Sequence, residues 1–321
     1  MAALSERQLV RRLGERFGSA SVGIQLGIGD DAAVLSASAA APAGASWVAS
    51  VDASVQGVHF DLRYVTLEDV GYRAFQAAAS DLAAMGAAPV GALSALVLPR
   101  GMSTAAVDEL TIGQQAASVE CGCPIVGGNI SRGGELSITT TVLGRAERPL
   151  SRCGARPGEQ VWLIGALGLA GAGLACLRVG STGDALGRCV QAWRRPRALI
   201  EPGLSLAGRA SCAIDVSDGL AADAAQLARA SGVRIVIDQS ALRAALDPRL
   251  VEASRFLRRS PTHFALYGGE DYALLATGPP RERPAGAIPI GYVRRGSGAV
   301  LATGPHRTLL RGGYDHLKQA R

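Results

Sequence analysis

The segment from Thr66 to Gly86 places the strongest restriction on the fold, because its pattern predicts one long helix. Thr66 and Asp69 form a helix start, and Gly86 forms a stop. Between these signals, small and apolar residues recur at helical spacing, at Val70, Ala74, Ala77, Ala78, Leu82 and Met85. A helix side so rich in alanine is usually packed against other elements.

Strand patterns surround this helix in an α+β or mixed α/β arrangement. We expect strands at 47–55, 92–98, 124–126 and 136–143, a helix from about Ser5 and another over 103–120. A polar, proline-containing segment at 146–151 precedes a new strand at 160–164. We therefore expect an N-terminal domain at 1–148 and a C-terminal α/β domain at 149–321.

The scarcity of lysine excludes several mechanisms, because Lys318 is the only lysine in 321 residues. A P-loop needs a Gly-Lys pair, a protein kinase needs a strand lysine, and a pyridoxal enzyme needs a Schiff-base lysine. If the protein handles ATP, metal ions and arginines must neutralise the phosphates. The glycines of 168–173 do not fit the G-x-G-x-x-G spacing of dinucleotide-binding proteins, so tight helix packing is the simpler interpretation.

Charge and composition limit the possible partners and compartment. The net charge is +6, but the arginines are dispersed and aromatic residues make up only 4%, so we expect no nucleic-acid partner. The charged N-terminus does not fit a signal peptide, and Gly86 and Pro89 interrupt the uncharged stretch 82–99, so we expect no membrane span. Six scattered cysteines indicate reduced thiols in a cytoplasmic protein.

Carboxylates in the N-terminal half occupy positions that do not favour them. Asp30 and Asp31 lie between glycines and an apolar strand, and Asp52 lies within a predicted strand, where aspartate is unfavourable. Asp81 lies on the alanine-rich side of the long helix, with no cation three or four positions away. Taken singly, an Asx turn at 30–31 and a solvated helix face at Asp81 are the alternative explanations.

The C-terminal half repeats this pattern. Asp215, Ser217 and Asp218 lie at a strand end just before a helix, and Glu270 and Asp271 lie at a glycine turn that leads into the strand 273–276. Taken singly, an N-cap is the alternative explanation of Asp218, and an ordinary turn is the alternative explanation of Glu270 and Asp271.

Together these acids indicate a common cause, because carboxylates that converge in partly buried places repel one another unless cations neutralise them. Oxygen ligands without a histidine or cysteine cluster suit Mg²⁺. Waters and substrate phosphates typically complete the coordination shell of this ion. The pattern therefore predicts a phosphoryl-transfer site in which ATP and Mg²⁺ meet.

At these residues the sequence resembles the thiamine-monophosphate kinases, members of the superfamily of aminoimidazole ribonucleotide synthetase. The resemblance covers nearly the whole chain. It is carried by the following strings: LGIGDDAAVL from Leu26, SVDASVQGVHF from Ser50, SDLAAMGAAP from Ser80, VGGNISRG from Val126, LSRCGARPG from Leu150, AIDVSDGLAAD from Ala213, YGGEDYALL from Tyr267 and GYDHL from Gly313.

The resemblance implies a two-domain aminoimidazole ribonucleotide synthetase-like fold, a homodimer paired through the N-terminal domain, and ATP with several Mg²⁺ ions in a cleft. The implied metal positions are Asp31, Ser50, Val51, Asp52, Asp81, Asn129, Asp215 and Asp218. The implied ATP-binding residues are Gly128, Asn129, Arg152 and Ser217. Thiamine monophosphate would contact His59, Glu270 and Tyr314, with Glu270 facing the cationic ring system.

Two positions depart from the family pattern, which commonly has Thr at Val51 and often Asp at Asn129. Val51 offers no side-chain oxygen, and Asn129 keeps an oxygen but loses a charge. We therefore expect activity with a raised magnesium requirement.

The expected reaction is direct in-line attack of a phosphate oxygen of thiamine monophosphate on the γ-phosphorus of ATP, without a covalent protein intermediate. A non-catalytic nucleotide-binding or regulatory homologue and aminoimidazole ribonucleotide synthetase are the alternatives. A selenophosphate synthetase should carry a reactive cysteine near its N-terminus and a hydrogenase-maturation dehydratase should end in cysteine. The first cysteine here is Cys121, and the chain ends in Arg321.

Overall fold

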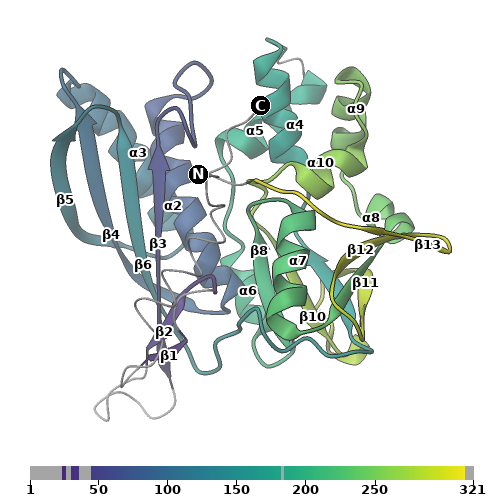
Figure 1. The fold of residues 1–321 in the computed structure, drawn as a ribbon. Coiled ribbons are helices and arrows are strands. Elements are labelled where there is room, and N and C mark those ends of the chain that lie inside the picture. The colour runs from purple at the N-terminus through teal and green to yellow at the C-terminus, as the bar shows by residue number, and fades with distance from the viewer. Residues whose placement is uncertain (1–23, 27–29, 36–44, 182–183, 315–321) are drawn as a thin grey trace, which may run out of the picture.

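Two β-sheets, one in each half of the chain, organise the protein (Figure 1). The computed structural model describes residues 24–26, 30–35, 45–181 and 184–314. The helix predicted from about Ser5, residues 27–29 of the first acidic motif and the chain end from 315 lie outside the described residues. The mixed helix and sheet content confirms the predicted fold class.

The first sheet has six strands in the order β1-β2-β3-β6-β4-β5. Their bounds are Ile24–Leu26, Ala33–Leu35, Ser46–Val55, Ser137–Ala146, Ala88–Pro99 and Ile125–Gly133. Only β4 and β5 pair in parallel among these described strands. The prediction of 124–126 was too short for β5, because an edge strand tolerates glycines such as Gly127 and Gly128 in its interior.

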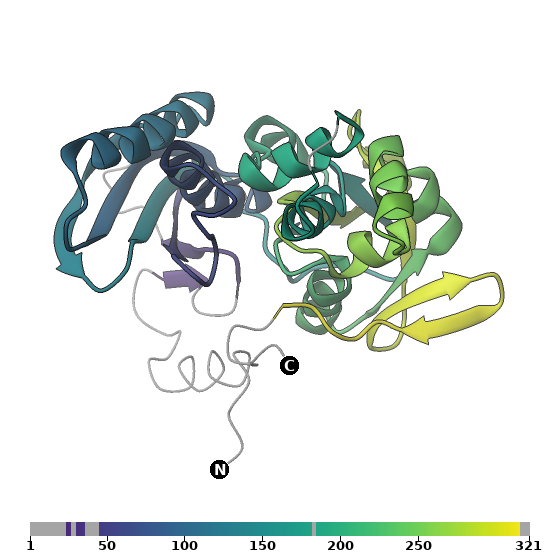
Figure 2. The same ribbon diagram turned by 90° about the horizontal axis from the view of Figure 1, so that it is seen from above.

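The long helix α2 (Leu67–Ala84) and α3 (Thr104–Glu120) cover one face of this sheet (Figure 2). The predicted cap is confirmed, since the Thr66 hydroxyl accepts the backbone N–H of Asp69 at 3.1 Å. The two helices pack so closely that a Cβ at Gly113 would lie 1.8 Å from the carbonyl oxygen of Glu68. This face of the sheet is therefore fixed by tight packing, while the opposite face carries no described helix (Figure 2).

The second sheet has seven strands in the order β13-β12-β9-β11-β7-β10-β8. Their bounds are His306–Leu309, Gly298–Thr303, Arg234–Asp238, Ile288–Arg294, Gln160–Ile164, Ala273–Gly278 and Cys212–Val216. Helix α7 (Leu220–Ser231) packs on this sheet against β8, β9 and β12. The remaining helical elements are α4 (Leu169–Arg178), α5 (Asp184–Arg194), α6 (Ile200–Leu206), α8 (Gln239–Ala244), α9 (Pro248–Phe256), α10 (Pro261–Tyr267) and η1 (Pro280–Glu282).

Helix α2 joins the two halves, because it contacts β8 and α6 as well as its own sheet. One hydrophobic cluster contains Val48 and Leu82 from the first half together with Trp162 and Leu274 from the second. The two sheets fall on either side of residue 148, but the core continues between them. The domain boundary at this residue stays a prediction.

All six cysteines are free thiols, and Cys153 is exposed whereas the other five are buried. Among the described residues, no helix is both long and apolar enough to cross a membrane.

Candidate active site

Three aspartates from distant parts of the chain meet where the two halves touch. Asp31 precedes β2, Asp81 lies near the end of α2, and Asp215 lies in β8. Each offers a carboxylate oxygen within 4.8 Å of the others, and we call this group the acidic cluster. Asp31 and Asp215 are only 8% and 4% exposed. The structure thus brings together three of the predicted metal ligands.

Serine hydroxyls from the same elements hold two of these carboxylates. Ser50 of β3 donates to the Asp81 carboxylate at 2.5 Å and lies 3.1 Å from the carbonyl oxygen of Asp31. Ser80 of α2 donates to the Asp215 carboxylate at 2.7 Å. The helix α2 therefore contributes one carboxylate to the cluster and orients a second from the other half of the chain.

The electrostatics of the acidic cluster favour a bound cation. Burial, with added repulsion from Asp215 and Asp31, raises the pKa of Asp81 well above its usual range. Burial and the charge of Asp31 raise the pKa of Asp215 to about 7. Hard oxygen donors that repel one another in a partly buried place are the donor set that suits Mg²⁺. The residues present therefore fit the predicted magnesium site.

Arg152, a predicted ATP ligand, forms a two-point contact with Asp31. Its Nη2 lies 2.6 Å from Asp31 Oδ1 and its Nε lies 3.2 Å from Oδ2. Its backbone N–H donates to the carboxylate of Asp30 at 3.0 Å. Asp31 is thus a member of the acidic cluster and also the ion-pair partner of Arg152, which lies in the linker between the two sheets.

Behind Arg152 lies a second carboxylate that sequence reasoning missed. The Arg152 guanidinium donates to Gln226, and Gln226 donates to Asp223. Asp223 is 1% exposed and accepts the backbone N–H of Asp218 at 3.2 Å. Burial raises the pKa of Asp223 well above its usual range. Its place at the end of the AIDVSDGLAAD string was the only available signal.

Asp218 directly precedes α7 and is not its N-cap residue. The N-cap residue is Gly219, at φ 99°. The alternative explanation of Asp218 as an N-cap is therefore wrong. Its backbone carbonyl accepts the N–H of Tyr314 at 3.3 Å, so the structure brings Asp218 beside a predicted substrate residue.

Asp52 and Val51 point to opposite faces of β3. Asp52 shares the helix-covered face with Ser50, and its charge contributes to the raised pKa of Asp81. Asp52 is not among the described carboxylates that lie within 4.8 Å of one another. The Val51 side chain is 62% exposed on the other face, away from the acidic cluster.

Gly128 and Asn129 do not reach the acidic cluster within one chain. The register runs from Asp52 through Thr140 and Ser94 to Gly128, three strand spacings or roughly 14 Å away. Asn129 is exposed and in register with Ala95, on the face opposite to Asp52. Sequence spacing alone did not reveal this separation.

Glu270, one of the predicted substrate residues, lies in a turn that has an unusual backbone. Glu270 and Tyr272 have φ values of 57° and 49°, and Gly269 has 68°. Left-handed conformations are costly for residues other than glycine and concentrate at functional sites. The N–H of Glu270 donates to the Ser217 carbonyl at 2.7 Å, so this turn is tied to the strand end that carries Asp215.

His59 and Tyr314, the other two predicted substrate residues, come from the two halves of the chain. His59 follows β3, is half-buried, and its Nδ1 accepts the backbone N–H of Val55 at 3.1 Å. The side chain of Tyr314 is 52% exposed beside the start of α7. An exposed aromatic ring there suits contact with a ligand.

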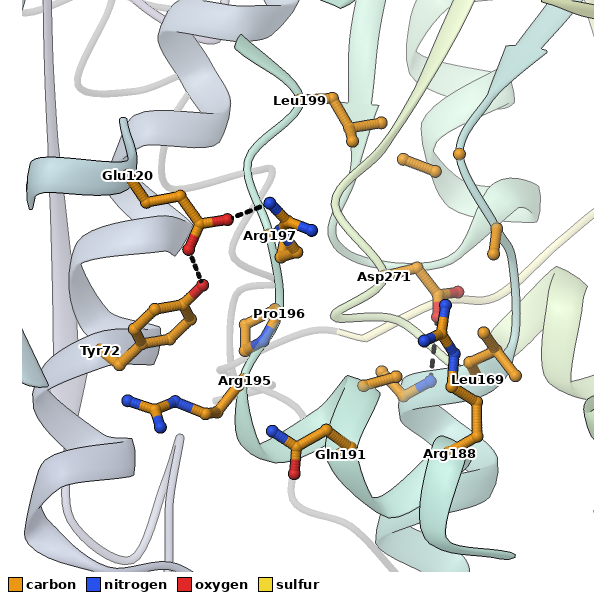
Figure 3. Close-up of a pocket in the computed structure, with 15 residues that line it drawn as sticks. Tyr72, Glu120, Leu169, Arg188, Gln191, Arg195, Pro196, Arg197, Leu199 and Asp271 are labelled. Carbon is orange, nitrogen blue, oxygen red and sulfur yellow. Dashed lines mark hydrogen bonds and ion pairs between the residues drawn. The ribbon is translucent and has the colours of Figure 1, made fainter. Parts of the chain in front are cut away.

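A separate cavity of about 640 Å³ lies beyond Asp271 (Figure 3). Its polar groups are largely partnered by the protein: Glu120 pairs with Arg197 and accepts the Tyr72 hydroxyl, and Arg195 pairs with Glu68. Asp271 accepts the N–H groups of Gly168 and Ala170 at the start of α4. None of its lining residues is a predicted ligand, so we place the reaction at the acidic cluster.

Comparison with known proteins defines the class to which this fold and site belong. The N-terminal domain of the AIR synthase related proteins matches residues 29–146, and the C-terminal domain of the same group matches residues 156–277. The chain is thus an AIR synthase related protein. Structures of the hydrogenase maturation protein HypE share this fold at 20% identity and a TM-score of 0.70.

Closer relatives narrow the class. The thiamine-monophosphate kinase of Aquifex aeolicus is 36% identical over 259 residues, which cover 78% of this chain and 83% of that protein. That of Corynebacterium glutamicum is 34% identical over 316 residues, covering 95% and 91%. A solved structure described as AaThiL complexed with AMPPCP and TMP superposes with a TM-score of 0.87 at 32% identity, covering 98% of this chain and 97% of that chain. The chain belongs to the thiamine-monophosphate kinase family.

Proposed function

We propose that this protein is a thiamine-phosphate kinase that transfers the γ-phosphoryl group of ATP to thiamine monophosphate, giving thiamine diphosphate and ADP. The observation that carries the proposal is the convergence of Asp31, Asp81 and Asp215 from three elements into one acidic cluster. The relative described with AMPPCP, an ATP analogue, and TMP supports both substrates.

The proposed magnesium ligands are the acidic cluster with Ser50, Asp52 and Asp218 close by. When bound, Mg²⁺ would offset the negative charge of the phosphates and of the transferred group. Arg152 and Ser217 are proposed to contact ATP. The guanidinium of Arg152 is a permanent positive charge that suits phosphate oxygens, and its contacts with Asp31 and Gln226 fix its orientation.

The acceptor is proposed to lie between His59, Glu270 and Tyr314. Its phosphate is already largely ionised near neutral pH, so the main barrier is repulsion between two anions. A general base is therefore less important than the positive charge supplied by Arg152 and by the metal site. The attacking oxygen bonds to the γ-phosphorus as the bond to the ADP oxygen breaks, with no phosphorylated protein between.

We also propose a homodimer formed through the uncovered face of the first sheet. Val51 and Leu93 expose apolar side chains on this face, and Val126 and Ile130 are exposed on its edge strand β5. Unpaired apolar surface of this kind is typical of interfaces. The arrangement provides a role for Gly128 and Asn129, which would serve as ATP and metal contacts at a site formed with the second copy.

The function is tested by ADP release from ATP and Mg²⁺ with thiamine monophosphate, hydroxyethylthiazole phosphate or an aminoimidazole precursor as acceptor. Of these three acceptors, we expect only thiamine monophosphate to support turnover. Turnover with the aminoimidazole precursor would favour the synthetase, and ATP binding without turnover would favour a non-catalytic homologue.

The direct mechanism needs a separate measurement. Rapid quench with labelled ATP should show labelled thiamine diphosphate without a labelled protein before it. A phosphorylated protein that appears first and decays into product would refute direct transfer.

A further inference from the structure

The carboxylate of Glu270 is held on both oxygens by side chains from two other helices. Arg73 of α2 forms an ion pair with Oε1, and the indole N–H of Trp193 in α5 donates to Oε2 at 2.7 Å. Neither partner lies in a motif that the sequence singled out. We call Arg73, Trp193 and Glu270 the carboxylate clamp.

Arg73 and Trp193 are themselves fixed to each other. The Arg73 guanidinium carbon lies 4.4 Å from the centre of the Trp193 ring, and its Nη1 donates to the Trp193 carbonyl at 3.0 Å. Both side chains are buried, with Arg73 at 4% and Trp193 at 2% exposure, whereas the Glu270 side chain is 30% exposed. The clamp therefore has two buried members that support one accessible carboxylate.

The clamp also counters an unfavourable backbone. Glu270 has φ 57°, a conformation that residues other than glycine seldom adopt. Its backbone N–H donates to Ser217, and the anchored side chain supplies two further contacts that hold this conformation. Without the side-chain contacts, the carboxylate would be free to take other rotamers.

Helix α2 connects the clamp with the acidic cluster. Arg73 and Asp81 lie on the same helix, so the rise of 1.5 Å per residue separates them by about 12 Å along the axis. Helix α2 thus helps to fix the position of the acidic cluster and, through Arg73, that of Glu270.

We propose that Arg73 and Trp193 are positioning residues that set the Glu270 carboxylate for the cationic ring of the acceptor. This inference rests on the proposed function, in which Glu270 contacts thiamine monophosphate. Arg73 is too deeply buried to contact the acceptor itself, so its effect passes through Glu270. The clamp acts on acceptor binding and leaves ATP binding unchanged.

Trp193→Phe tests the proposal, because it keeps an aromatic ring under Arg73 and removes the N–H donor together with the five-membered part of the indole. Trp193 is buried, so the unfolding free energy of the variant is measured beside its kinetics. We expect KM for thiamine monophosphate to rise about 10-fold, the lower range for a lost hydrogen bond to a charged group, with KM for ATP within about 2-fold of wild type. Arg73→Lys keeps the charge but loses the fork and the stacked plane, and it should shift the same constant.

A matched control is Arg195→Lys. Arg195 also stacks on an aromatic ring of α2, 4.5 Å from the centre of Tyr72, and pairs with Glu68 at 2.9 Å, but it does not touch Glu270. This variant should leave both KM values unchanged. A control that raises KM for thiamine monophosphate as much as Arg73→Lys would show that loosening the α2 contact is sufficient, and would overturn the proposal.

The deciding measurement is a double-mutant cycle. In a Glu270→Ala background, Trp193→Phe should change KM for thiamine monophosphate by less than about 2-fold, because its effect passes through the missing carboxylate. A full effect in that background, or an unchanged KM for Trp193→Phe alone, would refute the clamp. Wild-type turnover in the same assay separates these outcomes from failure of the proposed function, which would abolish turnover with thiamine monophosphate.

Discussion

Replacing Asp81 with asparagine should stabilise the metal-free protein and remove most of its response to magnesium. Two unit charges at the 4.8 Å limit of the acidic cluster repel by roughly 3.5 kcal/mol at an effective dielectric near 20. Arg152 offsets the charge of Asp31, so Asp215 is the principal source of net repulsion on Asp81. The amide oxygen of asparagine still accepts the hydroxyl of Ser50, so the substitution removes charge and little else.

We expect Asp81→Asn to raise the unfolding free energy at pH 8 without metal by about 2 kcal/mol, because partial protonation and solvent reduce the full pair repulsion. Magnesium should stabilise the wild type by about 2.7 kcal/mol at one hundred times its dissociation constant, and the variant by less than about 1 kcal/mol. The substitution should therefore raise stability without metal and weaken stabilisation by magnesium. A substitution that merely damaged the fold would lower stability in both conditions.

The assay is urea unfolding followed by tryptophan fluorescence, with EDTA or with saturating Mg²⁺. Asp108→Asn is the matched control, because Asp108 is exposed on α3, and it should change stability by less than about 0.5 kcal/mol in either condition. The reasoning is refuted if Asp81→Asn is less stable than wild type in EDTA or keeps the whole magnesium effect.

Three other substitutions test single contacts. Burial raises the pKa of Asp271 from 3.8 to about 7, so the folded state binds a proton more tightly and this residue lowers stability as the pH rises across that window. As the pH rises from about 4 to about 7, the unfolding free energy of Asp271→Asn, measured by urea unfolding, should fall less than that of the wild type. An equal fall in both proteins would contradict this. Arg152→Lys keeps the charge but loses the two-point contact with Asp31, so steady-state kinetics should show KM for ATP raised about 10-fold; a wild-type value would exclude its role. Asn129→Asp should lower the magnesium concentration that gives half-maximal rate, and an unchanged dependence would remove Asn129 from the metal site.

Local patterns allowed much of the fold to be predicted. The α2 helix was correct at both ends because its cap and its glycine stop act within a few residues. The strands at 47–55 and 136–143 were found because β-branched and apolar runs mark them directly. The apolar strand expected after Asp31 is β2, whereas the short strand β1 was missed, since three residues carry too little periodicity to separate a strand from a loop.

The site was predicted where a residue was locally unfavourable. Asp81 on an alanine-rich helix required an outside partner, and the structure places it with Asp215, which the sequence put at a strand end before a helix. The carboxylate clamp could not be found in this way, because Arg73 and Trp193 are unremarkable in their own segments and meet Glu270 only after folding. The separation of Asn129 from Asp52 depended on strand order, which spacing does not encode.

The most direct test of the metal-centred account is a crystal grown with Mn²⁺ and AMPPCP and measured at the manganese absorption edge. We expect anomalous peaks at coordination distance from carboxylate oxygens of Asp31, Asp81 and Asp215 and from phosphate oxygens of the nucleotide. Nucleotide bound with no anomalous peak at these three aspartates would contradict it.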